Sequence, residues 1–298
     1  MRPARPSRRT AAALALALAL IASLLAAPGA FANFITPKSG GSPNANSIDD
    51  LYKIVLYIAG VVFVIVEGAL VYSVYRFRAK KNPVAAQIHG NTRLEVGWTV
   101  AAALILVVLT VVTFVKLPSI INPPNSDASG LALSASTTVP NPPNGEKYVI
   151  CVQARQYIWR FTYGAGCVNS AFARKLPYSY TTMYAPAHTT VVLKIQSTDV
   201  IHSWWIPSLG GKVDAVPGYT TFTWFKAYKS AMVYRGQCAQ LCGVGHAAMV
   251  AFVQTMTPAN FQSWLKYQEN AITFANDQVL QLRQALVASG NLSPSGNF

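Results

Sequence analysis

The sequence predicts a membrane protein made of a two-helix transmembrane hairpin, an external all-β domain and a C-terminal helical tail. Two apolar stretches in the first half of the chain are each long enough to cross a bilayer. Beyond them, short β-branched and aromatic runs recur between turn signals. Of the 298 residues, 52% are hydrophobic and 11% are charged, a balance that is unusual for a soluble enzyme and that places part of the chain in lipid.

Residues 1–32 have the features of a secretory signal peptide. A basic front leads into an Ala/Leu-rich core, and Ala30-Phe31-Ala32 offers a small-x-small cleavage site before Asn33. An uncleaved first transmembrane helix is the alternative interpretation. Export predicts that the rest of the chain meets oxidising conditions.

The hairpin follows a short external lead-in, residues 33–50. Transmembrane helices are predicted over residues 51–76 and 95–117, because each stretch exceeds the roughly 20 residues that a helix needs to span the hydrocarbon core. The loop of residues 77–94 and its border carry five Lys or Arg residues, so we expect it to face the cytoplasm. The chain is then a two-helix protein of the cell (inner or plasma) membrane, with everything after the second helix on the external, periplasmic side.

The external part begins with a Pro-rich linker, residues 118–146. Strands are expected where β-branched and aromatic residues cluster, over residues 147–153, 157–163, 189–196, 220–225 and 249–255. This spacing predicts a β-sandwich or barrel over residues 147–257. Residues 258–298 are expected to form a helix from about 259 to 267, further helix over 271–287 and a frayed tail.

The formal charge of +14 does not indicate a nucleic-acid-binding protein. The densest basic clusters are in the signal segment and in the cytoplasmic loop, and neither alternates with aromatic residues. No internal repeat is visible, so a repeat architecture is not expected either. The charge balance therefore points to membrane topology rather than to a nucleic-acid partner.

Metal-binding side chains are concentrated in residues 238–249. Two thiols, one imidazole and one thioether fall within twelve residues: Cys238, Cys242, His246 and Met249. These ligands favour copper over magnesium or calcium. A one-copper loop needs a single cysteine, whereas a second cysteine lets two thiolates bridge two copper ions. One histidine cannot serve both metals, and His202 is the candidate for the second imidazole. The alternative is a disulfide pair beside surface histidines.

The surrounding sequence resembles a known family. Residues 199–204, 207–210 and 212–218 read Asp-Val-Ile-His-Ser-Trp, Pro-Ser-Leu-Gly and Lys-Val-Asp-Ala-Val-Pro-Gly. These motifs resemble the signature of cytochrome c oxidase subunit II, and the Cys-x-x-x-Cys-x-x-x-His-x-x-Met loop resembles its second half. The resemblance runs from the cytoplasmic loop to about Trp264. It implies a cupredoxin-like, Greek-key external domain.

The resemblance also implies a binuclear copper-A centre. Cys238 and Cys242 would bridge the two metals, and His202 and His246 would be terminal ligands. Met249 would be the weak axial ligand of one copper, and the backbone carbonyl of Gln240 would complete the other. The side chain of Gln240 replaces the glutamate that reaches a magnesium site at the subunit I junction in the family, and a neutral amide is a weaker ligand for magnesium. Magnesium is therefore doubtful here.

Further residues acquire expected roles from the same resemblance. Tyr157 stands where the family takes up electrons through Trp, and Trp159 follows two positions later, although core packing is the stronger interpretation for Trp159. Glu95 resembles the glutamate that opens a proton path, but a helix-start carboxylate is an equal alternative. Asp214 and the intramembrane Glu67 are expected at the subunit I interface.

Two cysteines remain outside the copper loop. If copper occupies the loop cysteines, Cys151 and Cys167 are left for each other, and they flank a segment that is predicted to form a hairpin. Oxidising conditions favour a disulfide between them. Two free buried thiols are the alternative.

The resemblance implies an electron-uptake subunit without catalytic residues of its own. It would accept electrons from cytochrome c or a similar external donor and pass them to haem in subunit I, which assembles with subunit III and reduces oxygen to water coupled to proton pumping. The alternatives are the same subunit in a copper-A nitric oxide reductase and a membrane-tethered copper delivery or storage protein. The intact ligands exclude a quinol-oxidase subunit that has lost copper.

The charge of the external part predicts the kind of donor. Residues 116–298 hold thirteen basic and six acidic residues, a formal charge of +7. The usual acidic residue of the family's uptake segment falls in residues 160–163, which read Arg-Phe-Thr-Tyr here. We therefore expect a donor that is not strongly basic, because like charges slow the encounter. An acidic exterior, in which carboxylates would be protonated, could equally account for their scarcity.

Overall fold

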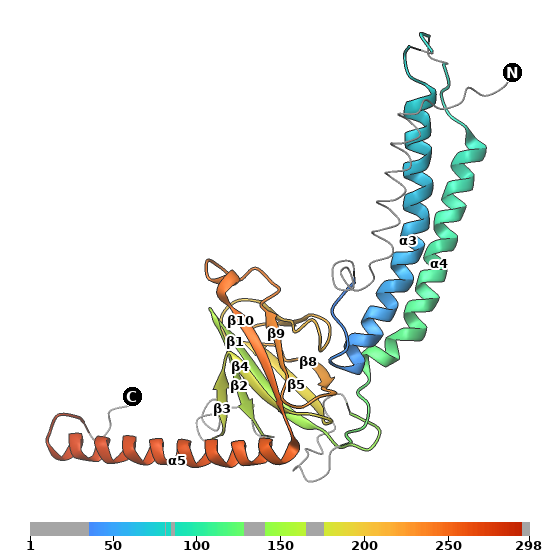
Figure 1. The fold of residues 1–298 in the computed structure, drawn as a ribbon. Coiled ribbons are helices and arrows are strands. Elements are labelled where there is room, and N and C mark those ends of the chain that lie inside the picture. The colour runs from blue at the N-terminus through green and yellow to red at the C-terminus, as the bar shows by residue number, and fades with distance from the viewer. Residues whose placement is uncertain (1–35, 81, 85–86, 128–140, 165–175, 294–298) are drawn as a thin grey trace, which may run out of the picture. The chain divides into compact units, whose positions relative to one another are not determined.

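The computed structural model describes residues 36–80, 82–84, 87–127, 141–164 and 176–293. Within them the chain forms two long helices, a set of ten β-strands and a C-terminal helix, in that order (Figure 1). All these elements belong to one unit, Ser39–Phe298. The predicted signal peptide, residues 1–32, lies outside the described residues. The sequence-based fold class is confirmed.

The first two helices are α3 (Pro43–Arg76) and α4 (Thr92–Ile121), which pack against each other as a hairpin. Both are long and apolar enough to cross a membrane, and their most apolar windows contain no buried residue. Large apolar side chains are exposed along both helices. Such a surface requires lipid or protein around it. The two predicted transmembrane helices are confirmed.

Both helices extend beyond the predicted apolar stretches. α3 begins eight residues before residue 51, with Pro43 in its first turn, where the missing N–H of proline is not needed. Its first turns contain polar residues such as Asn44 and Asp49, so hydropathy marks the membrane-spanning part and not the start of the helix. α4 continues through Pro118, where we expected the linker to begin, because the N–H of Asn122 still bonds the carbonyl of Pro118.

The external domain is built from ten short strands. In chain order they are β1 (Tyr148–Arg155), β2 (Ile158–Tyr163), β3 (Tyr178–Tyr180), β4 (Thr182–Pro186), β5 (Thr190–Ser197), β6 (His202–Trp204), β7 (Val213–Ala215), β8 (Thr221–Lys226), β9 (Val233–Gln237) and β10 (Val250–Met256). They form a five-stranded sheet in the order β3-β2-β1-β5-β8, a three-stranded sheet β4-β10-β9 and a two-stranded ribbon β6-β7. The parallel pairs β1–β5 and β4–β10 require crossover connections between the sheets.

The five predicted strands correspond to β1, β2, β5, β8 and β10, each within about two residues of its expected ends. The other five were missed. Three of them have only three residues, too few for an alternating pattern to emerge, and β4 ends at a proline. β9 reads Val-Tyr-Arg-Gly-Gln, in which an arginine and a glycine break the β-branched pattern. The missed β6 and β9 lead into the metal-binding segments.

The core of the external domain is aromatic. Trp159, Phe161 and Trp204 are all nearly inaccessible to solvent. The ring of Trp159 packs edge-to-face on Trp204 at a centroid distance of 5.3 Å and also lies 6.1 Å from the ring of His202. Edge-to-face packing is a favourable arrangement of aromatic rings. The backing of His202 is therefore a rigid aromatic cluster.

The C-terminal helix α5 (Pro258–Ala288) is continuous, whereas the sequence predicted a break near residue 268. The side chain of Thr257 accepts a hydrogen bond from the N–H of Asn260 and so caps its start. Phe261 is fully buried, and Trp264 packs against the same core. The polar residues near 268 interrupt the apolar pattern but not the helix, because glutamine and glutamate are good helix formers.

We predict that Gly236→Ala will destabilise the external domain by about 2 kcal/mol, the usual cost of forcing a methyl group into a packed site. A Cβ on Gly236 would overlap the carbonyl oxygen of Trp205, which also accepts the N–H of Gln237. Gly60→Ala is the control, because a Cβ there meets nothing within 4 Å. Denaturant unfolding of the purified chain measures the difference. Equal stability of the two variants would contradict this packing.

Candidate metal centre

Two segments far apart in the sequence form the site. β6 carries His202, and the loop between β9 and β10 carries the cysteines. The N–H of Cys238 bonds the carbonyl of Met249 and closes the loop at its base. The N–H of Ala239 bonds the carbonyl of Ser203 and ties the loop to β6. These backbone bonds bring His202 to the two thiols.

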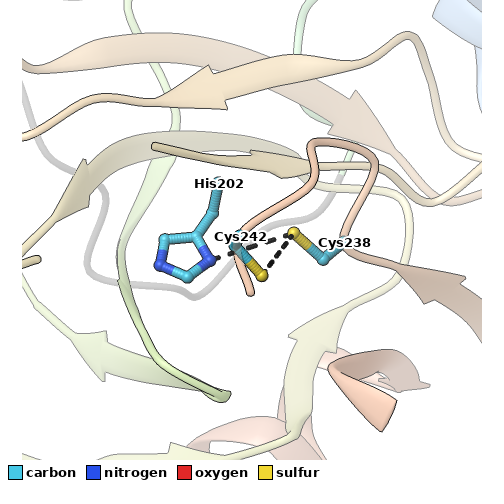
Figure 2. A group of neighbouring side chains, drawn as sticks. All are labelled: His202, Cys238 and Cys242. Atoms are coloured by element: carbon cyan, nitrogen blue, oxygen red, sulfur yellow. Dashed lines mark hydrogen bonds between the residues drawn. The ribbon is translucent and has the colours of Figure 1, made fainter. Parts of the chain in front are cut away.

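The two sulfur atoms lie at the centre of the site (Figure 2). The Sγ atoms of Cys238 and Cys242 are 3.9 Å apart, and Nδ1 of His202 lies 3.9 Å from Sγ of Cys238. The ligand atoms of these three residues all lie within 4.8 Å of one another, and all three residues are buried. A metal–sulfur bond is about 2.3 Å long, so one metal ion can reach both sulfurs.

The remaining predicted ligands surround the same sulfur pair. Nδ1 of His246 lies 3.6 Å from Sγ of Cys242, and Sδ of Met249 lies 4.0 Å from it. The backbone oxygen of Gln240 lies 3.3 Å from Sγ of Cys238. Each sulfur thus has one imidazole beside it and one weaker donor. The structure brings together all six groups that the sequence predicted.

The site lies just beneath the surface. His202 and Met249 are buried, while His246 is half-buried and Gln240 is exposed. The apolar side chains of Leu241 and Val244 project into solvent from the same loop, 77% and 102% exposed. A partner protein can therefore approach the ligand loop closely without entering the domain.

Asp199 sets the orientation of the His202 ring. Nε2 of His202 donates to Oδ1 of Asp199 at 2.9 Å, which leaves Nδ1 with its lone pair facing the sulfurs. Burial opposes ionisation of Asp199, but hydrogen bonds from the Gln156 N–H, His202, the Val200 N–H and Ser197 outweigh it and lower the pKa of the carboxyl to about 2. Asp199 is therefore an ionised acceptor at neutral pH. The sequence motif contained it but did not reveal this role.

The thiol of Cys242 is held protonated in the absence of metal. Burial, together with repulsion by the neighbouring Cys238, raises the pKa of Cys242 to about 11. A bound cation would reverse this preference, because a coordinated thiol loses its proton. Two thiols with two imidazoles and a thioether beside them suit copper, and they suit magnesium or calcium poorly. The residues therefore fit a copper centre.

Tyr157 and Trp159 have different environments. Tyr157 is half-buried, and its ring lies against the backbone of Gly243 and Gly245 in the ligand loop. Trp159 is inaccessible to solvent and belongs to the aromatic core beside His202. Tyr157 is thus the residue of this pair that lies between the ligand loop and solvent.

The predicted membrane and interface residues lie on α3, α4 and β7. Oε1 of Glu95 accepts the N–H of Asn91, while the Asn91 side chain accepts the N–H of Leu94, so Glu95 takes part in the cap of α4. Glu67 lines an apolar groove between α3 and α4. Asp214 is exposed on β7, paired with Ser203 of β6. The cap agrees with a helix-start role of Glu95 and does not test a proton path.

Of the second cysteine pair, Cys151 is among the described residues. Cys151 lies on β1, in the predicted hairpin with β2, and is disulfide-bonded. Its predicted partner, Cys167, lies outside the described residues. Cys238 and Cys242 are free thiols. The pairing of Cys151 with Cys167 stays a prediction.

The apolar hairpin, the external domain of packed β-sheets and the Cys/His/Met cluster define a class: membrane-bound copper proteins with a cupredoxin-like external domain. The family model described as cytochrome C oxidase subunit II, periplasmic domain, matches residues 167–256, and the transmembrane-domain model of the same subunit matches residues 32–115. A probable cytochrome c oxidase subunit 2 of Rickettsia prowazekii is 30% identical over 244 residues, which are 78% of this chain and 71% of the relative. The chain belongs to the cytochrome c oxidase subunit II family.

Other relatives extend this result. Cytochrome c oxidase subunit 2 of Cereibacter sphaeroides is 28% identical, over 85% of this chain and 88% of its own length. That of Alkalihalophilus pseudofirmus is 30% identical, over 78% of this chain and 61% of its own length. The crystal structure of the periplasmic domain of subunit II of cytochrome oxidase (CoxB) of Bradyrhizobium japonicum aligns at 25% identity with a TM-score of 0.37, over 42% of this chain and 95% of that one.

Family membership confirms several sequence-based predictions. The chain is a membrane-bound subunit of a haem–copper oxidase with a copper-binding periplasmic domain, and it takes part in electron uptake. The matched family models and relatives are subunits of cytochrome c oxidases, which favours the oxidase over the copper-delivery and nitric oxide reductase alternatives.

We predict that alkylation of Cys242 in the metal-depleted chain will keep accelerating between pH 9 and pH 10. Only the thiolate reacts, and its pKa of about 11 lies above that range. In denaturant the rate should level off, because the ordinary thiol pKa of 9.0 is passed. Mass spectrometry of the modified loop peptide measures both rates. A plateau at the same pH in folded and unfolded chains would contradict a raised pKa.

Proposed function

We propose that this chain holds two copper ions between Cys238 and Cys242 and relays electrons through them, one at a time, to haem in subunit I. His202 and His246 are the terminal ligands, and Met249 and the carbonyl of Gln240 are the weak ones. The observation that carries the proposal is the symmetry of the site: each sulfur has its own imidazole, at 3.9 and 3.6 Å. His246 lies outside the group of His202, Cys238 and Cys242, whose ligand atoms all lie within 4.8 Å of one another, so a single ion at that group would leave His246 without a metal.

The proposed site suits rapid electron transfer. Both thiols, His202 and Met249 are buried and fixed by backbone bonds between the loop and β6. Two metals that share thiolates spread a change of one charge over both ions, so little ligand movement accompanies it. When bound, the copper pair supplies the redox chemistry, and the protein supplies a fixed ligand geometry.

We propose Tyr157 as the residue through which an external donor meets the site. Its ring lies on Gly243 and Gly245 of the ligand loop, at the half-buried edge of the domain. Trp159 packs behind His202 in the core, and we assign it support of that ring. The exposed Leu241 and Val244 offer apolar contact around Tyr157.

We propose that this donor is not strongly basic. Asp199 is the acidic residue of the site, and its carboxylate is occupied by His202 and the Gln156 N–H. Arg155, beside it, is exposed and adds positive charge. With +7 on residues 116–298, a basic donor is repelled at long range.

Other roles complete the proposal. Subunits I and III are the membrane partners, with Asp214 and Glu67 at the subunit I interface. Glu95 is proposed to open a proton path in addition to capping α4. A family-type magnesium site is not proposed, because Gln240 supplies only a neutral amide. Cys151 and Cys167 are proposed to form the disulfide.

We predict that Cys242→Ser will lower the copper content of the purified oxidase subunit by at least one ion per chain, because the bridge between the metals is lost. Met249→Leu should keep both ions and raise the midpoint potential, since a weak axial ligand is removed. Met232→Leu, an exposed methionine outside the site, is the control. Metal analysis and redox titration are the measurements. Full copper content in Cys242→Ser would contradict the bridging role.

We predict opposite salt dependences for donors of opposite charge. In stopped-flow reduction, a basic cytochrome c should react faster as salt is added, whereas an acidic donor should slow down. Arg155→Glu should speed the basic donor severalfold, and Lys266→Glu on α5 is the control with the same change in net charge. If a basic cytochrome c reacts fastest at low salt with the unmodified protein, the proposed donor class is wrong.

A further inference from the structure

The turn between β1 and β2 is hydrogen-bonded both to Asp199, which holds His202, and to the loop that carries the cysteines. The N–H of Gln156 donates to Oδ2 of Asp199 at 2.7 Å, and the other oxygen of Asp199 accepts from Nε2 of His202. The side-chain amide of Gln156 donates to the backbone carbonyl of Cys242 at 2.7 Å. A continuous chain of hydrogen bonds therefore runs from His202 through Asp199 and Gln156 to Cys242.

We propose that Gln156 is a positioning residue that fixes the ligand loop relative to His202 before any metal binds. The inference rests on the proposed copper centre for its functional meaning, but the bond itself is a property of the metal-free chain. Backbone bonds hold the base of the loop at Cys238 and Ala239. Gln156 holds its far side, at Cys242, through the carbonyl next to Gly243.

The loop needs a restraint at this point because glycine follows. Gly243 has a φ of +130°, a conformation that residues with side chains rarely adopt, and Gly245 lies two residues further on. A Cβ on either glycine would come within 2.5 Å of the Tyr157 ring or its hydroxyl. The glycines permit the close approach of Tyr157, and they also make the loop costly to order. The hydrogen bond from Gln156 and the contact with Tyr157 offset that cost.

Gln156 can be changed without disturbing the core, so its effect on the ligand loop can be measured separately from the stability of the domain. Its backbone is at a turn and the residue is exposed, so it contributes little to the hydrophobic core. Loss of its side-chain hydrogen bond should make the ligand loop more mobile and leave the β-sheets of the external domain intact. Groups that orient metal ligands in this way commonly change metal affinity or redox properties when they are removed.

The test is amide hydrogen exchange, followed by mass spectrometry, on the metal-depleted full-length chain in detergent. Gln156→Leu keeps the size of the side chain and removes its donor. Exchange in the loop peptide covering residues 238–249 should rise about tenfold, the effect of losing about one hydrogen bond, while peptides from β1 and β5 stay unchanged. Gln153→Leu, on β1 three residues earlier, is the control and should leave the loop unaffected.

The copper-loaded variant provides the second readout. Gln156→Leu should shift the midpoint potential of the centre, and Gln156→Asn, whose amide is too short to reach the carbonyl of Cys242, should shift it in the same direction. Unchanged loop exchange in Gln156→Leu would overturn the inference, and so would an equal rise in exchange across all the β-sheets of the external domain. Because exchange is measured without metal, a one-copper result for the native chain would defeat the proposed function and leave this inference standing.

Discussion

The metal centre depends on the attachment of the β9–β10 loop to β6. The N–H of Ala239 bonds the carbonyl of Ser203 within β6, and the N–H of Gln237 bonds the carbonyl of Trp205, directly after this strand. These bonds bring together the thiols and the buried imidazole, which lie on two segments far apart in the sequence. Gly236 permits this close contact because a side chain there would overlap Trp205. The site is thus a product of strand packing, with the aromatic core behind it as a rigid support.

Metal binding and burial have opposite effects on the protonation of the thiol of Cys242. Burial disfavours the thiolate of Cys242, so the metal-free protein keeps this thiol protonated, and a metal must displace its proton when it binds. The ionised Asp199 helps by holding the proton of His202 on Nε2, which leaves Nδ1 free. The side chains are therefore arranged to bind a cation, while the protonated thiol of Cys242 reacts slowly in the metal-free protein.

The sequence predicted the group of side chains that meets at the candidate site, because their order and spacing are chemically unusual. It predicted the transmembrane hairpin and the five longer strands because hydrophobicity and β-branching extend over enough residues to form a pattern. It did not reveal the hydrogen bonds of Gln156 and Asp199, which join residues 43 positions apart in one case and 86 in the other. Nor did it reveal β6 or β9, which are held by pairing with neighbours and not by their own composition. The start of α3 and both ends of α4 were missed, because polar residues open both helices and α4 continues through Pro118.

The central claim is that two copper ions share the thiols of Cys238 and Cys242. Electron paramagnetic resonance of the half-reduced, copper-loaded subunit tests it most directly. The account predicts one unpaired electron whose hyperfine splitting is shared equally by two copper nuclei, and a loss of this shared splitting in Cys242→Ser. Splitting by a single copper nucleus in the native protein would contradict the account.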